Sequence, residues 1–580
     1  MKKILIGMIV LFIVLPILTS AATYYVSTTG SDTSSGTQAA PWKTIQKAAN
    51  TMVAGETAIV QAGDYSSERV SVTKSGSSGA PITYQASGIV IMKGFKIIAN
   101  YVTVKDFEIA NTDYVRWQPS IGSGVYIKGN NVVIDSNYIH DSSLNGITLY
   151  GSPDTNSTTI THDCIMRNNK VYRNEMVGIE VHGRNNLIEG NEVWNTLQCH
   201  PALVAVEGPG CPGYSAVGSL DADGMRFFGA GDIFRNNYIH DIKYDGSLVV
   251  NAHIDCWQTW AGTYNEVASN IIFEQNFCDN LQSQASNENG HGFMLAGGAN
   301  NIYIKNNIIR AYGGINTGGT GNANYLYIYN NLWINNLAFT QFYPMAVGLE
   351  NVPNAVVKNN IFYNQPYHTI YSSGTVTSQD IDYNLAYNSD GSTPDCFRVV
   401  SFSCKSPAPV HDLWKVDPKF VNPNAGDYHL SAGSPAIDAG VVISSVTNDY
   451  AGSSRPQGAG YDIGAFEYGA ATPPDCTEAD WMHTDGLCQP NNTLVRTWTK
   501  INSNCQGGVS HPASEIVSCT YIPPNVPGDL TGDGKVDVQD LIIVASDFGK
   551  TTNLNNPKSD TNSDGIVDIF DVVYIASRFT

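Results

Sequence analysis

The chain has 580 residues and a formal net charge of −20, although only 14% of its residues are charged. This length indicates more than one domain. The negative charge excludes nucleic acid as a partner, because its phosphates would be repelled. It also disfavours an acidic polymer as a ligand, unless metal ions or a local basic patch intervene.

The first 22 residues have the features of a secretory signal. Two lysines precede an apolar run that ends at Leu18, and small residues follow at positions 20–22. The run is short for a membrane span, and an uncleaved anchor is the alternative interpretation. No later segment is long and apolar enough to cross a bilayer. We therefore predict a secreted or cell-surface protein without a membrane span in the mature chain.

Eleven cysteines in an exported chain permit disulfide bonds. The odd number leaves at least one thiol unpaired or joined to another chain. Cys199 with Cys211, and Cys396 with Cys404, are close enough in sequence to pair within loops. A further group is expected to pair within one short segment: Cys476, Cys488, Cys505 and Cys519.

An asparagine followed by any residue and then an apolar residue recurs along the chain. It is found at Asn137, Asn169, Asn191, Asn237, Asn276, Asn307, Asn331, Asn360 and Asn384. The spacing fits one coil of a solenoid plus a variable loop. Short β-type runs lie between these sites, which excludes a helical-pair repeat, and a propeller blade needs a longer unit. We predict a parallel β-helix with a ladder of asparagine amides; the alternative is that these asparagines only mark loops.

The two ends of this region carry sequences that resemble a known class of proteins. Residues 24–49 resemble the start, and residues 417–440 and 455–468 the end, of secreted right-handed parallel β-helix proteins. That class includes families of polysaccharide lyases. The resemblance covers roughly residues 23–468 and implies an all-β domain. The end motifs are specific for the fold and weak for the reaction.

The strand-opening residues Gly146, Gly178, Gly224, Cys256 and Gly292 set a common register for five coils. Two of the columns that follow are mostly apolar and should face inward. The first contains Ile147, Ile179, Met225, Trp257 and Phe293. The second contains Leu149, Val181, Phe227, Thr259 and Leu295.

The alternate columns should face solvent and form a strip of polar and aromatic side chains. We predict substrate-binding residues at Tyr150, Glu180, His182, Phe228, Gln258 and Trp260. The candidate catalytic residues lie on the same coils: Asp221, Asp223, Arg226, His253, Asp255 and His291. Aromatic faces pack on sugar rings and polar groups hold hydroxyls, so the strip is typical of a saccharide groove.

Asp223 and Asp255 are expected on neighbouring coils, where two carboxylates cannot both ionise freely. If one holds a proton, the pair supplies the acid and base for glycoside hydrolysis. If calcium neutralises the pair, it could bind a uronate and favour elimination, with His or Arg as the base. Residues 221–227 resemble the calcium-binding strand opening of one pectate lyase family. The alternative is that both aspartates cap turns.

The C-terminal part is predicted to contain a linker at 469–475, a small Cys/Trp-rich module at 476–524 and a calcium module at 525–580. The Cys/Trp-rich module faintly resembles thrombospondin-type modules. Residues 529–540 and 560–571 share a 12-residue spacing with a turn glycine at position six. The predicted ligands are Asp529, Thr531, Asp533, Lys535 (carbonyl), Asp540, Asp560, Asn562, Asp564, Ile566 (carbonyl) and Asp571, with Asp537 and Asp568 acting through water.

A helix is expected after each loop, and this duplicated loop–helix unit resembles a type I dockerin over about residues 527–580. The resemblance implies two bound calcium ions and attachment to a cohesin-type protein. The positions expected to face that partner are Val538, Gln539, Ile569 and Phe570. A third calcium ion near Asp223 and Asp255 is a further prediction.

Together these features predict a secreted polysaccharide-degrading enzyme, a hydrolase or a lyase, with a calcium-dependent attachment module. Two other hypotheses stay open. In one, the β-helix is a non-catalytic adhesin or glycan-binding stalk. In the other, the last segment is only a calcium-stiffened cap and binds no cohesin.

Overall fold

A computed structural model was obtained for the chain. It describes residues 21–110, 118–150, 161–201, 204, 221–243, 254–261, 266–280, 290–318, 323–335, 345–365, 368–374, 378–392, 396–400, 403–404, 410–469, 477–478, 481–485, 492–500, 509, 511, 514–518, 528–531, 535–562 and 564–579. The chain divides into two compact units, Met1–Thr472 and Pro473–Thr580, and each is described by itself. No helix in the described part is long and apolar enough to span a membrane.

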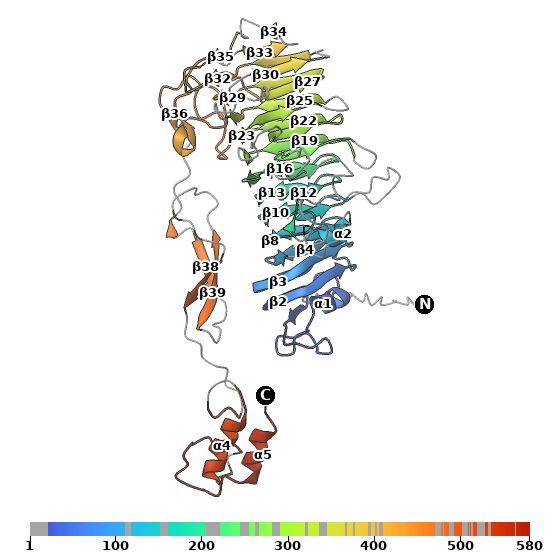
Figure 1. The fold of residues 1–580 in the computed structure, drawn as a ribbon, viewed down its shortest axis with the longest axis vertical. Coiled ribbons are helices and arrows are strands. Elements are labelled where there is room, and N and C mark those ends of the chain that lie inside the picture. The colour runs from blue at the N-terminus through green and yellow to red at the C-terminus, as the bar shows by residue number, and fades with distance from the viewer. Residues whose placement is uncertain are drawn as a thin grey trace, which may run out of the picture. The chain divides into compact units, whose positions relative to one another are not determined.

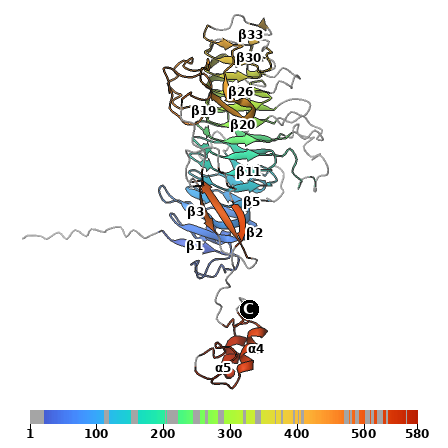
Figure 2. The same ribbon diagram turned by 90° about the vertical axis from the view of Figure 1, so that its left-hand side faces the viewer.

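The first unit is the predicted parallel β-helix, with its coils stacked in chain order (Figures 1 and 2). Strands β1 (Thr23–Val26), β2 (Thr57–Val72) and β3 (Ile82–Ile97) begin the stack, and helix α1 (Ile45–Thr51) precedes β2. Strand β3 is long enough to pair with three later strands, one on each side of the solenoid. From β4 to β32, the strands pair in parallel from one coil to the next, and the stack ends at β31, β33 and β35.

Three stacks of short strands result, which we call the first, second and third sheets. The first contains β4 (Val102–Lys105), β7 (Val133–Asp135), β10 (Ile165–Arg167), β13 (Leu187–Glu189), β16 (Ile233–Arg235), β19 (Ser269–Glu274), β22 (Asn300–Lys305), β25 (Asn324–Tyr329), β28 (Asn354–Lys358) and β31 (Ser378–Asp382). The second contains β5 (Glu108–Ala110), β8 (Tyr138–His140), β11 (Lys170–Tyr172), β14 (Glu192–Trp194), β17 (Tyr238–His240), β20 (Phe277–Asn280), β23 (Ile308–Ala311), β26 (Leu332–Ile334), β29 (Ile361–Tyr363), β32 (Leu385–Tyr387) and β35 (Leu413–Trp414). The third contains β6 (Val125–Ile127), β9 (Ile147–Leu149), β12 (Val177–Val181), β15 (Asp223–Phe227), β18 (Trp257–Thr259), β21 (His291–Leu295), β24 (Gly313–Asn316), β27 (Met345–Glu350), β30 (His368–Ser373) and β33 (Cys396–Val400).

The predicted asparagine ladder is confirmed at the corner between the first and second sheets. The Oδ1 atom of Asn169 accepts from both the backbone N–H and the amide of Asn137, at 3.0 Å each. Its own amide donates to the backbone oxygen of Ile134. The same pattern runs through all nine asparagines and ends where Asp412 Oδ1 accepts from the backbone N–H of Asn384. Each coil is therefore tied to the next by buried amide hydrogen bonds, which are costly to leave unmade.

A shorter ladder at another corner also ends in an aspartate. Asp232 Oδ1 accepts from the backbone N–H and the amide of Asn186, at 2.8 and 2.9 Å. Its second oxygen, Oδ2, is buried and has no hydrogen-bond partner among the described residues. Burial raises the pKa of Asp232 to about 8, so the side chain keeps its proton at neutral pH.

Replacing Asp232 with Asn should remove a pH dependence of stability. Between about pH 4 and pH 8 the folded protein retains a proton on Asp232 that the unfolded chain has released. The free energy of unfolding therefore falls, as the pH rises, by up to about 1.4 kcal/mol per pH unit. Asn offers the same acceptor and stays neutral throughout. Urea denaturation across this window measures the slope. Asp163→Asn, which changes a partly exposed carboxylate beside His162, is the control and should retain the native slope.

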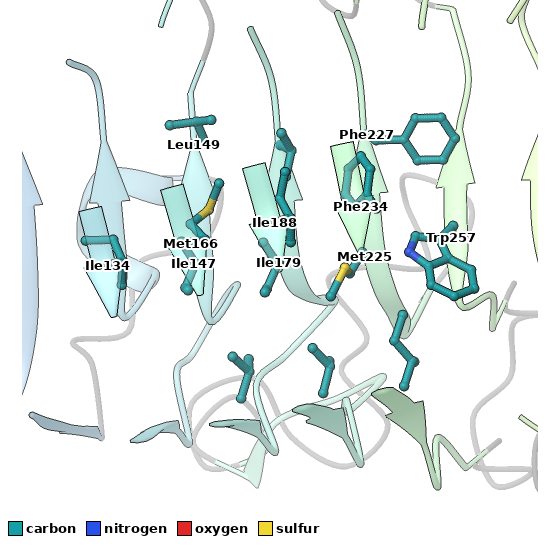
Figure 3. Packing of buried hydrophobic residues seen from close by; sticks show 14 of the residues in the cluster. Ile134, Ile147, Leu149, Met166, Ile179, Ile188, Met225, Phe227, Phe234 and Trp257 are labelled. Atoms are coloured by element: carbon teal, nitrogen blue, oxygen red, sulfur yellow. The ribbon is translucent and has the colours of Figure 1, made fainter. Parts of the chain in front are cut away.

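The inward columns are confirmed: all ten predicted residues are at most 1% exposed. Figure 3 shows Ile147, Ile179, Met225 and Trp257 pointing into the solenoid from successive coils. Towards the middle of the stack the filling becomes aromatic, and Trp257 stacks on Phe293 with ring centroids 4.7 Å apart. The removal of these side chains from water is the main stabilising term of the unit.

In most coils a glycine at the strand-opening position packs against an apolar side chain of the second sheet. In one coil a disulfide takes the place of these two residues. A Cβ on Gly224 would lie 2.5 Å from Ile239, so a side chain there is excluded. One coil further on, Cys256 and Cys278 occupy the positions of this glycine and isoleucine, and a disulfide joins them. The free Cys164 is buried, and Cys199 is disulfide-bonded, while Cys211 lies outside the described residues.

Changing Cys256 and Cys278 to serine together should lower the free energy of unfolding by about 3 kcal/mol, the value expected for closing a loop of this length. The double change Cys256→Gly and Cys278→Ile should recover most of that loss, because it recreates the pair found one coil earlier. Denaturation of both double variants under oxidising conditions measures the difference. Equal stabilities of the two variants would contradict the explanation.

The end of the first unit folds back along the second sheet. It includes β36 (Phe420–Asn422), η3 (Pro423–Ala425) and β37 (Asp427–Leu430), whereas β34 (Ser403–Cys404) pairs antiparallel with β33 of the third sheet. Tyr428 and Ile463 pack against Leu332 and Ile361 of the second sheet. The segment is closed by a fully buried ion pair between Arg455 and Glu467, and Arg455 also donates to Asn306.

The second unit contains an antiparallel sheet and two helices. The sheet is formed by β38 (Trp481–Asp485), β39 (Thr493–Lys500) and β40 (Ser514–Ser518). The helices are α4 (Val538–Asp547) and α5 (Ile569–Ala576), as predicted after each loop. Asp537 and Asp568 cap these helices, and each forms a reciprocal capping box with the residue three positions later.

Candidate active site on the third sheet

The predicted alignment of the coils is confirmed by the strand register. Glu180 pairs with Arg226, Arg226 with Gln258, and Gln258 with Met294. The register continues to Asn316 on β24. Side chains that are distant in sequence therefore form one row on the outer surface of the third sheet. A short helix, α2 (Pro119–Gly122), lies before β6, the first strand of the third sheet.

The predicted exposure of this row is wrong for most of its members. Asp223, Asp255 and Phe228 are fully buried, and Arg226 and Gln258 are 4% exposed. His182 and His291 are also buried, at 7% and 8%. The side chains that remain partly open are Tyr150, Glu180, Asp221 and Trp260. Alternation along a strand predicts which side of the sheet a residue faces, but it does not predict what covers that side.

Arg226 lies at the centre of a cluster of carboxylates. Its Nε donates to Asp223 at 2.7 Å and its Nη2 donates to Asp221 at 3.0 Å. Its guanidinium carbon lies 5.0 Å from the ring centroid of Trp260. Arg226 therefore acts as the counter-ion of two aspartates, and its predicted role as a base is not supported. Burial raises the pKa of Asp223 well above its usual range, and Arg226 opposes this shift.

Asp223 and Asp255 are neighbours, as predicted, but their oxygens are held by the protein. Asp223 Oδ1 accepts the backbone N–H of Asp255 at 3.0 Å. Asp255 Oδ1 in turn accepts the backbone N–H of His291 at 3.0 Å. The two carboxylates thus link three coils in the same way as the asparagine ladder does at its corner. This arrangement makes them positioning residues rather than groups that touch a substrate.

His291 is oriented by partners on both sides of its ring. Its Nδ1 lies 3.0 Å from Asp255 Oδ1, and its Nε2 lies 3.3 Å from the amide nitrogen of Asn316. The Oδ1 atom of Asn316 accepts from Gly318, so its amide nitrogen is the atom that faces His291. A carboxylate at Nδ1 and an amide donor at Nε2 select the tautomer with its proton on Nδ1. Nε2 is then the basic nitrogen.

Glu180 and His182 form a second carboxylate–imidazole pair at the end of β12. Glu180 Oε1 lies 3.0 Å from His182 Nε2, and the amide of Asn145 donates to Oε2. Burial raises the pKa of Glu180, but the hydrogen bond and charge of His182, the charge of Arg226 and the hydrogen bond from Asn145 together hold the pKa below its usual value. Glu180 is therefore ionised at neutral pH and can accept hydrogen bonds at its open edge.

An aromatic row borders the polar one. His182 stacks on Phe228 with ring centroids 4.5 Å apart, and Phe228 meets the edge of Trp260 at 4.9 Å. Tyr150 lies 6.2 Å from His182 at the other end. Because Phe228 is fully buried, its predicted contact with a sugar is wrong. Tyr150 and Trp260 are the partly open members that can meet a ligand.

Two features of the site were not predicted from the sequence. Asn316, which faces His291, would have been found by extending the same columns by one coil. The disulfide at Cys256 adjoins Asp255 and is visible only once Cys278 is placed beside it. His253 lies outside the described residues. In the described part of the chain, no three His, Cys, Asp or Glu side chains form a group that could hold a metal ion.

The second predicted calcium loop is described almost completely. Asp564 and Gly565 donate their backbone N–H groups to the two oxygens of Asp560, at 3.1 and 2.9 Å. Gly565 has a φ of 89°, which permits the sharp bend at position six. Asp571 is buried at position twelve. Of the first loop, Asp529, Thr531, Lys535 and Asp540 are described, whereas Asp533 lies outside the described residues.

A family model described as the Pel9A-like right-handed beta-helix region matches residues 24–198. The match ends before β15 and covers under a third of the chain. No curated protein matches the chain.

Solved structures with a similar fold include three carbohydrate-related proteins. Pectate lyase Pel9A is 17% identical, with a TM-score of 0.47 over 77% of this chain and 97% of that chain. XylC in complex with xylose is 14% identical, with a TM-score of 0.46 over 77% and 98%. An alginate lyase from Paenibacillus sp. str. FPU-7 is 14% identical, with a TM-score of 0.32 over 59% and 92%.

Proposed function

We propose that this protein is a secreted enzyme that cleaves a polysaccharide on the outer surface of the third sheet. The observation that supports this most is the connected row of ionisable side chains from Glu180 to His291. A parallel β-helix needs no such row for its stability, because burial of charged groups costs free energy unless they are paired. Their concentration over four coils, beside an aromatic row, is typical of a functional site.

His291 is the proposed general base. Asp255 holds its proton on Nδ1. Nε2 would accept a proton from a reacting group in exchange for the 3.3 Å hydrogen bond that the Asn316 amide donates to it. The carboxylate of Asp255 would also stabilise the imidazolium that forms. Asn316 holds the opposite side of the ring in place. Glu180 and Asp221 would accept hydrogen bonds from sugar hydroxyls, while Tyr150 and Trp260 would contact the apolar faces of sugar rings.

A panel of polysaccharides tests this function with the full-length protein. New reducing ends, or a product absorbing as an unsaturated sugar, are the expected results. Mass spectrometry of the products then separates hydrolysis from elimination, because elimination products lack one water. Binding without any product would favour a second candidate, a glycan-binding stalk. That alternative is supported by the way Asp223 and Asp255 are engaged with the protein itself.

The C-terminal helices are proposed to form a calcium-dependent attachment module of the dockerin type. The side-chain donors of the second loop are all oxygens, which is the ligand type that calcium prefers. Bound calcium would neutralise the loop carboxylates and hold each loop against its helix. Val538, Ile569 and Phe570 are 57%, 56% and 68% exposed, so an apolar surface is available to a cohesin-type partner.

Calorimetric titration of the full-length protein with calcium should show two sites. The change Asp564→Asn should remove one of them, because it deletes a charged ligand while preserving the shape of the side chain. Lys558→Gln, an exposed change between the two helices, is the control and should retain both sites. The further calcium ion near Asp223 and Asp255 stays a prediction, and the same titration would count it as a third.

A further inference from the structure

The charge on the third sheet indicates which polysaccharides its site can accept. Arg226 is the only lysine or arginine between Arg184 and Arg235, and none is present at 244–304. Lys243 lies in the segment that leads into β18, and Lys128 lies at the Tyr150 end of the row, with its Nζ 5.9 Å from that ring's centroid. A carboxylated sugar bound without a metal ion at the open edge formed by Glu180 and Asp221 therefore has Arg226 as its cationic partner.

Arg226 is not available for that role. Two of its nitrogens already donate to Asp221 and Asp223, and the side chain is 5% exposed, with its guanidinium carbon 5.0 Å from the ring centroid of Trp260. Breaking either ion pair would leave a buried carboxylate uncompensated, at a cost of several kcal/mol. A uronate carboxylate could bind Arg226 only by displacing Asp221 or Asp223 from it.

The partly open groups of the row are acceptors. The side chains of Glu180 and Asp221 are 20% and 15% exposed, and both are carboxylates. A second negative charge beside them is repelled, more strongly in a partly buried site than in water. A hydroxyl group, in contrast, donates a hydrogen bond to a carboxylate and leaves the charge balance of the cluster unchanged.

We propose that this site binds an uncharged polysaccharide and cleaves it with water. This proposal deepens the proposed function and rests on it. Elimination is the alternative for a uronate-containing chain, since the sugar carboxylate acidifies the adjacent C–H. An uncharged sugar has no such group. Water would add across the glycosidic bond: its oxygen bonds to the anomeric carbon, the bond to the leaving oxygen breaks, and that oxygen gains a proton.

Matched polymers give the sharpest test. Polygalacturonate and alginate would each be compared with its own carboxyl-reduced form, which has the same linkage but a primary alcohol in place of each carboxylate. Xylan, mannan, galactan and β-glucan would complete the uncharged set. We expect retardation in affinity electrophoresis only with uncharged polymers, and products with the full mass of an added water.

Two variants link the result to the row. Asp221→Asn removes one negative charge from the open edge. The ratio of the affinity for the carboxyl-reduced polymer to that for the native polymer should therefore fall by about tenfold or more. Glu189→Gln on β13, which changes the partner of Arg235 on the first sheet, is the control and should leave discrimination unchanged.

The outcomes separate this inference from the function on which it rests. Preference for native polygalacturonate or alginate, or products lacking one water, would overturn the inference and leave the enzymatic function standing. Absence of both binding and cleavage with every polymer would overturn both. Binding and hydrolysis of an uncharged polymer, with the Asp221→Asn effect, would support both.

Discussion

Changing His291 to Gln is expected to lower kcat by about 10²–10⁴-fold, which is the contribution of a well-placed general base. Glutamine keeps a polar side chain of similar size but cannot take up a proton. Asp255→Asn should cause a comparable loss, because an amide at this position no longer holds the proton on Nδ1 or stabilises an imidazolium. The imidazole lies 3.0 Å from Asp255, so the two residues act as one unit.

The measurement is kcat and KM on whichever polysaccharide the panel identifies. Because the two residues act together, the double variant should lose no more than either single one. His162→Gln, which changes an imidazole paired with Asp163 just before β10, is the matched control and should retain native kcat. Native kcat in the His291→Gln variant would remove this residue from the proposed mechanism.

Changing Arg455 to Met should lower the free energy of unfolding by about 3–5 kcal/mol, because it leaves Glu467 charged and without its partner in a fully buried site. Arg455 also donates to the backbone oxygens of Gly464 and Ala465, and each of these oxygens would lose one of its two donors. This one side chain thus closes the segment that covers the second sheet.

Urea denaturation followed by tryptophan fluorescence measures the loss. The double variant Arg455→Met with Glu467→Leu should recover part of the stability, since replacing both members of a buried ion pair by apolar groups is often nearly neutral. Arg167→Met, at a half-exposed pair with Asp135, is the surface control and should cost less than about 1 kcal/mol. A small loss in Arg455→Met would contradict the structural role of the pair.

Much of the fold could be predicted from local sequence. A repeated asparagine before an apolar residue marks a corner where an amide can bond to the coil above and the coil below, and all nine lie in one ladder. The column of strand-opening residues that includes Gly224 could also be predicted, because a glycine that recurs in successive coils indicates a place where a side chain does not fit. Both patterns can be detected in a single sequence because every coil repeats the same local geometry.

The candidate site was only partly predictable. The row from Glu180 to Asn316 follows from the register, and the register follows from the repeat. Burial of Asp223 and Asp255, the engagement of Arg226 by two carboxylates, and the orientation of His291 do not follow from it. Each depends on side chains contributed by other coils, whose separation in sequence varies with the length of the intervening loops.

The sequence by itself determined the β-helix, its inward columns and the alignment of its coils, because a solenoid converts periodicity directly into neighbouring positions. Only the tertiary structure decided which carboxylates are held by the protein and which remain open to a ligand. The physical reason is that exposure and ion pairing depend on what packs over a strand, and a residue's place within its own strand carries no information about that covering.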